Sequence, residues 1–81
     1  TGVSTFKNNV HLLDSDELEF GGAEGATGDL RIVHNGTDSK ILNSTGLLDV
    51  NADRLELRSI TGVETYVSAA VGAGVSLFFD N

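Results

Sequence analysis

Short runs of alternating apolar and polar residues recur along the chain, and residues 16–20 (DELEF) are the clearest of them. Leu18 and Phe20 fall on one side of an extended chain, and Glu17 and Glu19 fall on the other. Because side chains alternate between the two faces of a β-strand, this run predicts a strand with one apolar face. The same pattern predicts further strands in residues 29–34, 39–42, 48–50 and 54–58.

The breaks between these runs are rich in Gly, Asn, Asp and Ser, which are typical of turns. Residues 21–28 form a glycine-rich stretch that predicts a loop between two strands. Asn35-Gly36 predicts a tight hairpin turn, because both residues tolerate a positive φ.

The last third of the chain keeps a period of two from Val63 to Phe79, with apolar or β-branched residues at the odd positions. A helix competes with this interpretation, since several of the same residues also fall on a helical stripe. Gly72 and Gly74 count against the helix, because each glycine costs about 1 kcal/mol in a helix interior. We expect strand structure with a turn at residues 72–74, and the whole chain is predicted to be all-β.

A recurring Leu-x-apolar pattern supplies the candidate core, but one short strand cannot bury its apolar face alone. A single domain of 81 residues buries little of its surface, and this chain has no Trp, 6% aromatic residues and no Cys for disulfides or thiolate zinc sites. We therefore expect copies of the chain to share one core. The predicted shared core consists of Leu18, Phe20, Leu30, Ile32, Leu55, Leu57, Val75, Leu77 and Phe79.

The net charge of −7 bears on the possible partners. Such a charge repels phosphate backbones and anionic membranes, and no apolar run reaches the roughly 20 residues that a membrane helix needs. We expect neither nucleic-acid binding nor membrane insertion. The acidity is typical of a soluble surface, with attraction of cations or basic partners as the alternative. The chain also lacks Met, which predicts a processed product or a fragment of a longer protein.

Four segments, in this order, resemble elements of tail-fibre and related virion structural proteins of marine bacteriophages and cyanophages. Residues 2–6 (GVSTF) resemble a lead-in element, and residues 14–21 (DSDELEFG) resemble the element "DSDELRFG". Residues 28–41 (GDLRIVHNGTDSKI) resemble "DLRIYHDG-x-NSYI", and residues 74–81 (GVSLFFDN) resemble "GVELYYDN". The departures are Val33 in place of Tyr, Asn35 in place of Asp, and Phe78 and Phe79 in place of a Tyr pair, and the chain ends before the family's lysine-rich continuation.

The resemblance implies a fibrous β-structured shaft, a location in the virion and no catalysis. Together with the thin core, it predicts an elongated, intertwined homotrimer built as a triple-stranded β-helix or a β-prism. Residues 1–81 would form a single shaft segment that contacts neighbouring fibre segments and supports host attachment mechanically. The rival functions are a receptor-binding tip or adhesin module, which would touch a host surface receptor, and a polysaccharide-degrading enzyme; a monomeric β-domain is a further alternative.

Metal binding has two candidates, His11 and His34, since identical histidines of a trimer can converge on its axis. His34 is the better one, because it is in phase with Leu30 and Ile32, but a hydrogen-bonded histidine beside the turn is the favoured interpretation. Residues 21–29 weakly resemble a calcium-binding glycine-rich repeat, yet only one degenerate copy is present. We therefore expect no cofactor, and His34 as the one metal candidate.

Two other groups of residues have a chemical interpretation. Asp14, Asp16, Glu17 and Glu19 could act as paired carboxylates on a glycoside, but a solvated sheet edge is the favoured account. Tyr66, Phe78 and Phe79 could form a surface that stacks on carbohydrate, or they could pack at a trimer interface, which the sequence favours. No catalytic residues are predicted.

Overall fold

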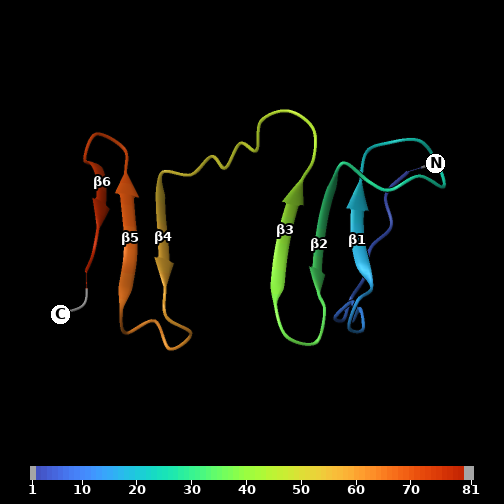
Figure 1. The fold of residues 1–81 in the computed structure, drawn as a ribbon, viewed down its shortest axis with the longest axis horizontal. Helices are drawn as coiled ribbons and strands as arrows, with labels where there is room; N and C mark the ends of the chain where they lie inside the picture. The colour runs from blue at the N-terminus through green and yellow to red at the C-terminus, as the bar shows by residue number, and fades with distance from the viewer. Residues whose placement is uncertain (1, 80–81) are drawn as a thin grey trace. The chain divides into compact units, whose positions relative to one another are not determined.

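The computed structural model describes residues 2–79, which form two three-stranded antiparallel sheets and no helix (Figure 1). The predicted all-β class is confirmed. The chain divides into two compact units, residues 1–48 and 49–81, and each unit holds one sheet. The first sheet consists of β1 (Glu17–Phe20), β2 (Leu30–His34) and β3 (Ser39–Asn43), and the second of β4 (Arg54–Arg58), β5 (Thr65–Ala70) and β6 (Gly74–Leu77).

The first sheet is an up-and-down meander in the order β1-β2-β3. Its register places Leu18 opposite Ile32, and Ile32 opposite Ile41, so that the three side chains form one row across the sheet. Phe20 pairs with Leu30 on the same face. The alternation that predicted the strands therefore also predicts one apolar face correctly.

The β2–β3 connection is the hairpin that Asn35-Gly36 predicted. Four residues, 35–38, connect the strands, and Gly36 alone of them has a positive φ, at 97°. The Asn35 side chain instead organises the loop, because its Oδ1 accepts hydrogen bonds from the amides of Thr37 and Asp38 at 3.0 and 2.9 Å. An Asx-type turn has replaced the backbone turn.

The second sheet has the order β4-β5-β6. Leu57 pairs with Val67, which pairs with Leu77, and a β-bulge follows between Leu57 and Arg58. The run from Val63 to Phe79 is divided into two strands by a turn, as expected, and the turn lies at residues 71–73 in place of 72–74. The strand predicted at residues 48–50 is wrong, because that segment has no regular structure.

The two units share a sequence pattern as well as a topology. Each first strand begins with Asp-x-Leu-Glu-apolar, at residues 16–20 and 53–57, and each is preceded by Leu-Leu-Asp, at residues 12–14 and 47–49. The spacing between the two motifs differs by two residues, which hides the repeat from a search at one fixed period. The chain is thus built from two versions of one supersecondary unit.

Candidate functional site

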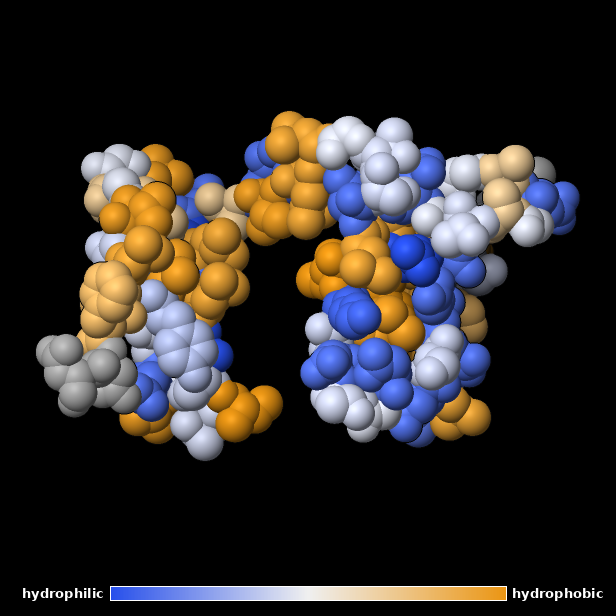
Figure 2. All heavy atoms as spheres, viewed as in Figure 1, coloured by the Kyte–Doolittle hydropathy of each residue, from blue (hydrophilic) through white to orange (hydrophobic). Residues whose placement is uncertain are grey.

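The apolar face of the first sheet is the most prominent unpartnered surface of that unit. Within residues 2–79 no hydrophobic side chain is buried, and Leu18, Ile32 and Ile41 are 46%, 43% and 64% exposed. Figure 2 shows hydrophobic side chains at the surface of both units. A strand-based unit normally buries this face against a second layer, and residues 2–48 contain no second sheet and no helix that could form one.

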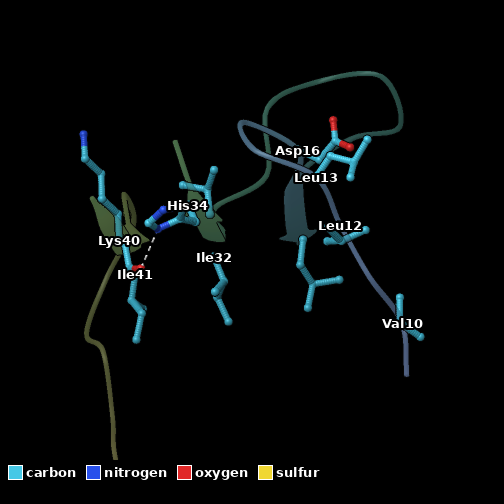
Figure 3. Close-up of a pocket in the computed structure, with 11 residues that line it drawn as sticks. Val10, Leu12, Leu13, Asp16, Ile32, His34, Lys40 and Ile41 are labelled. Carbon is cyan, nitrogen blue, oxygen red and sulfur yellow. Dashed lines mark hydrogen bonds between the residues drawn. The ribbon is translucent and has the colours of Figure 1, made fainter. Parts of the chain in front are cut away.

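A groove runs along this face, between the sheet and the segment that precedes β1 (Figure 3). Val10, Leu12 and Leu13 line one side, and Ile32 and Ile41 lie on the other. Its volume is about 530 Å³, so the N-terminal segment leaves substantial space over the sheet. The groove has room for several apolar side chains from another chain.

The second unit repeats this arrangement. Its apolar face carries Leu55, Leu57, Val67, Val75 and Leu77, in register across the three strands. A smaller hollow lies between the segment before β4 and this face, and it is lined by Val50, Ala52, Leu55, Ala69, Ala70 and Val71. Two units of one design thus present the same kind of open apolar surface.

The size of the exposed surface supports the need for a partner. The accessible surface of the 8.5 kDa chain is 7291 Å². Two independent globular domains of half that mass would together expose about 5,600 Å². The chain therefore exposes more surface than two independent globular domains of its mass would.

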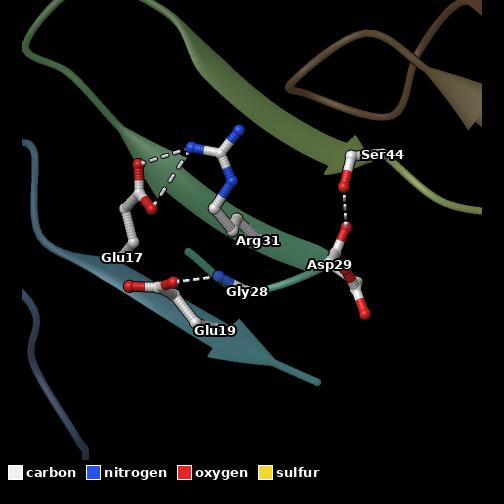
Figure 4. A network of polar contacts seen from close by, with 6 residues as sticks. All are labelled: Glu17, Glu19, Gly28, Asp29, Arg31 and Ser44. Carbon is white, nitrogen blue, oxygen red and sulfur yellow. Dashed lines mark hydrogen bonds and ion pairs between the residues drawn. The ribbon is translucent and has the colours of Figure 1, made fainter. Parts of the chain in front are cut away.

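The opposite face of the first sheet carries a polar network that Figure 4 shows. Arg31 Nη1 lies 3.2 Å from the carboxylate of Glu17, with both side chains 26% exposed. Glu19 accepts a hydrogen bond from the amide of Gly28. Ser44 donates to the backbone oxygen of Asp29 from both its amide and its hydroxyl group. Glu17 and Glu19 lie on the edge strand β1, where Glu17 is half-buried, Glu19 is exposed, and both make contacts within the sheet.

The corresponding face of the second sheet is organised around one carboxylate. Glu56 pairs with Arg54 and Arg58, and the Ser68 hydroxyl donates to it at 3.4 Å. Each sheet thus combines an apolar face with a face on which charges neutralise one another. This asymmetry indicates that another chain would cover the apolar face of each sheet and leave the charged face in water.

His34, the metal candidate, ends β2, and its Nδ1 lies 2.9 Å from the hydroxyl of Ser39 on the neighbouring strand. This is the hydrogen-bonded histidine beside the turn that the sequence favoured. His11 precedes β1 and lies outside any strand. Among residues 2–79, no three His, Cys, Asp or Glu side chains gather in a way that could hold a metal ion.

The structure places the expected core residues on two sheets. Leu18, Phe20, Leu30 and Ile32 share the first apolar face, and Leu55, Leu57, Val75 and Leu77 share the second. Phe79 lies beyond the end of β6 and lines a different groove, with Tyr66 and Phe78. Whether these residues meet across chains remains a prediction.

Two contributions to the apolar surfaces were not predicted. Ile41 completes the row with Leu18 and Ile32, and the alternation in residues 39–42 carried that signal. The apolar segment before β1 was also missed, because it forms no strand and has no period. The segment before β4 includes residues 48–50, which the alternation predicted as a strand, and the Leu-Leu-Asp motif is the signal that the two segments share.

Comparison with protein-family models, with curated proteins and with solved structures found no match to this chain. Residues 2–79 include no helix that could cross a membrane.

Proposed function

We propose that this chain is a structural shaft segment of a bacteriophage tail fibre or a similar virion appendage, and that it functions as an intertwined homotrimer. The observation that carries the proposal is the exposed apolar face on each sheet. A lone chain that leaves Leu18, Ile32 and Leu57 in water loses the main favourable contribution to folding. Association through these faces restores it.

The trimer is favoured by the resemblance of the four sequence elements to those of trimeric fibres. In a closed ring of three, every copy has two neighbours that can cover its apolar faces. Three apolar faces directed towards one axis form a prism-like core, with the Glu17–Arg31 and Glu56–Arg58 faces outside. Three copies carry a net charge of three times −7, or −21, which keeps such a rod soluble.

The repeated unit supports the shaft rather than a globular domain. Each unit is one meander that cannot bury its apolar face alone, and successive copies along the chain extend a shared core without changing its width. The mechanical role follows from this construction: a rod with a continuous core transmits position between the particle and the host contact. The virion assignment comes from the resemblance of the four sequence elements.

The test is the molar mass of the chain in solution, measured by light scattering across a concentration series, with circular dichroism to verify strand content. We expect a mass three times 8.5 kDa and an elongated particle by small-angle scattering. A folded, cooperative monomer would overturn the proposal. The virion location has its own test, since peptides of this chain should occur in purified particles of the virus that encodes it.

A further inference from the structure

The loop between β2 and β3 carries the one Asn-Gly pair of the chain, Asn35-Gly36, which the proposed shaft does not use. The loop lies at the end of the first sheet (Figure 1), and both residues are exposed. A peptide nitrogen that follows an asparagine can attack the side-chain amide of that asparagine, and a following glycine hinders this attack least because it has no Cβ. The pair is therefore a place where the chain can modify itself.

The nitrogen of Gly36 is free for this reaction. Within residues 2–79 its amide donates no hydrogen bond. The ends of the loop are held, since the amide of Asn35 donates to the oxygen of Asp38 at 3.0 Å and His34 pairs with Ser39. Glycine changes its backbone angles more freely than any other residue, so Gly36 can approach the Asn35 side chain while the rest of the loop stays in place.

The side chain of Asn35 is held in a way that favours the attack. Its Oδ1 accepts hydrogen bonds from the amides of Thr37 and Asp38, at 3.0 and 2.9 Å. When a nucleophile adds to Cγ, negative charge develops on this oxygen, and two backbone amides at such distances stabilise the charge as in an oxyanion hole. The loop thus supplies the electrophile, the nucleophile and the donors that lower the barrier.

Asn43-Ser44 is the contrasting pair in the same unit. The amide of Ser44 donates to the oxygen of Asp29 at 2.9 Å, so the nitrogen that would attack is engaged. The side-chain nitrogen of Asn43, which would leave, donates to the oxygen of Gly46 at 3.1 Å. Asn43 is therefore the internal control for Asn35.

We propose that Asn35 is a self-modification site that deamidates in the folded protein. The nitrogen of Gly36 forms a bond to Cγ of Asn35, the bond from Cγ to Nδ2 breaks, and Nδ2 leaves as ammonia with the proton of the Gly36 amide. Water then opens the resulting succinimide at either of its two carbonyl carbons. Opening at Cγ leaves aspartate at position 35, and opening at the main-chain carbonyl leaves isoaspartate.

Both products change the loop. Each adds one negative charge to the net charge of −7. The charge enters a loop that contains Asp38 and has Asp14 beside it, since a Cβ added to Gly36 would lie 3.5 Å from Asp14 Oδ2. Aspartate keeps an oxygen that accepts from the two loop amides, whereas isoaspartate lengthens the main chain by a methylene group. We therefore expect the isoaspartate form, with its like charges close together, to loosen the β2–β3 hairpin as the protein ages.

The experiment incubates the assembled protein in mildly alkaline buffer and follows residues 32–40 and 41–54 by mass spectrometry. Trypsin releases both peptides, because they end at Lys40 and Arg54; the first holds Asn35 as its single asparagine, and the second holds Asn43 and Asn51. We expect the amide to be replaced by a carboxylate in residues 32–40, with isoaspartate among the products, and far less change in residues 41–54. Equal conversion of the two peptides would overturn the proposal.

A synthetic peptide of residues 32–40 gives the reference rate, because it has the same sequence without the loop. The folded protein is expected to react at least as fast as this peptide, since only the folded loop directs two amides at Asn35 Oδ1. Slower conversion in the folded protein would show that the loop protects Asn35, and this too would overturn the proposal.

Variants locate the reaction, with native ion-exchange chromatography to separate the forms by charge. Asn35→Gln keeps an amide but would have to close a larger ring, so the acidic forms should disappear. Asn43→Gln is the matched control and should leave them unchanged. Asn35→Asp marks the retention expected after complete conversion to aspartate. Acidic forms that persist in Asn35→Gln would contradict the site.

The modification does not rest on the proposed shaft, because Asn35 lies in a loop outside the apolar faces. The same chromatography separates the two proposals, since a homotrimer passes through one charge step for each of its chains and a monomer through a single step. A trimer without conversion refutes the modification and leaves the shaft intact. A folded monomer refutes the shaft, and conversion at Asn35 would then still support the modification.

Discussion

The amide of Gly28 donates a hydrogen bond to the carboxylate of Glu19, and a Cβ added to Gly28 would lie 2.7 Å from the Cβ of Glu19. Gly28 is also the one buried residue among residues 2–79. The glycine-rich loop between β1 and β2 thus ends in a close contact, which holds the backbone of Gly28 against β1.

This contact predicts that Gly28→Ala destabilises the first unit by about 1–3 kcal/mol, because the added methyl group overlaps Glu19. Urea unfolding at fixed protein concentration measures the change. Glu19→Gly removes the obstructing Cβ, so the double variant should be less destabilised than the sum of the two single variants. Strict additivity of the two changes would show that the overlap is not the cause.

Substitutions of two adjacent residues of β2 distinguish a trimer from a monomer. Ile32 points to the apolar face and is 43% exposed in the single chain, whereas Val33 is half-buried on the polar face. Ile32→Thr should raise the concentration at which the trimer dissociates, corresponding to about 1–3 kcal/mol per chain. Val33→Thr is the matched control, which keeps the β-branch; Val33 also borders the groove, so we expect a smaller effect on association than that of Ile32→Thr. A larger effect of Val33→Thr on molar mass would contradict the assignment of the faces.

The loop between β2 and β3 depends on one side-chain acceptor. Asn35→Ala removes the oxygen that accepts from the amides of Thr37 and Asp38, and we expect a loss of about 1 kcal/mol in the free energy of unfolding. Asn35→Asp keeps the acceptor and should cost clearly less. Equal losses for Asn35→Ala and Asn35→Asp in a thermal unfolding series would mean that the side-chain NH2 group of Asn35, rather than its oxygen, stabilises the loop.

The strand positions were predictable from the sequence because they depend on a local period. Leu18 and Phe20 alternate with Glu17 and Glu19, and the pairing in β1 retains that alternation. Residues 48–50 share the pattern but form no strand, because no neighbouring segment offers them a ladder of hydrogen bonds. The alternation of apolar and polar residues thus predicted which segments can form strands. Pairing with a neighbouring segment determined which of these segments do form strands.

The candidate site was only partly predictable, for a similar reason. The apolar faces follow from alternation, but the groove beside Ile41 also needs Val10 and Leu12, which lie in a segment without a period. The roles of Glu17 and Glu19 depend on their partners Arg31 and Gly28, which lie 14 and 9 residues away. Such non-local partners follow from the register of the sheet and cannot be read from the residues alone.

Metal removal gives a further prediction. His34 already uses its Nδ1 in a contact with Ser39, so we expect prolonged dialysis against EDTA to leave the molar mass and thermal stability unchanged. Elemental analysis of the dialysed protein should find no bound transition metal. Retained metal at one ion per three chains, lost in His34→Ala, would instead place three histidines on the trimer axis.

Salt should strengthen the association, because copies that each carry −7 repel one another. Raising the ionic strength from about 0.01 M to about 0.15 M shortens the screening length from about 30 Å to about 8 Å, so the concentration at half-dissociation should fall. The Glu17–Arg31 pair is partly exposed and contributes little, so its screening does not reverse the trend. Glu24→Lys reduces the net charge by two and should make association less dependent on salt. If added salt instead dissociated the protein, attraction between opposite charges, and not the shared apolar faces, would hold the copies together.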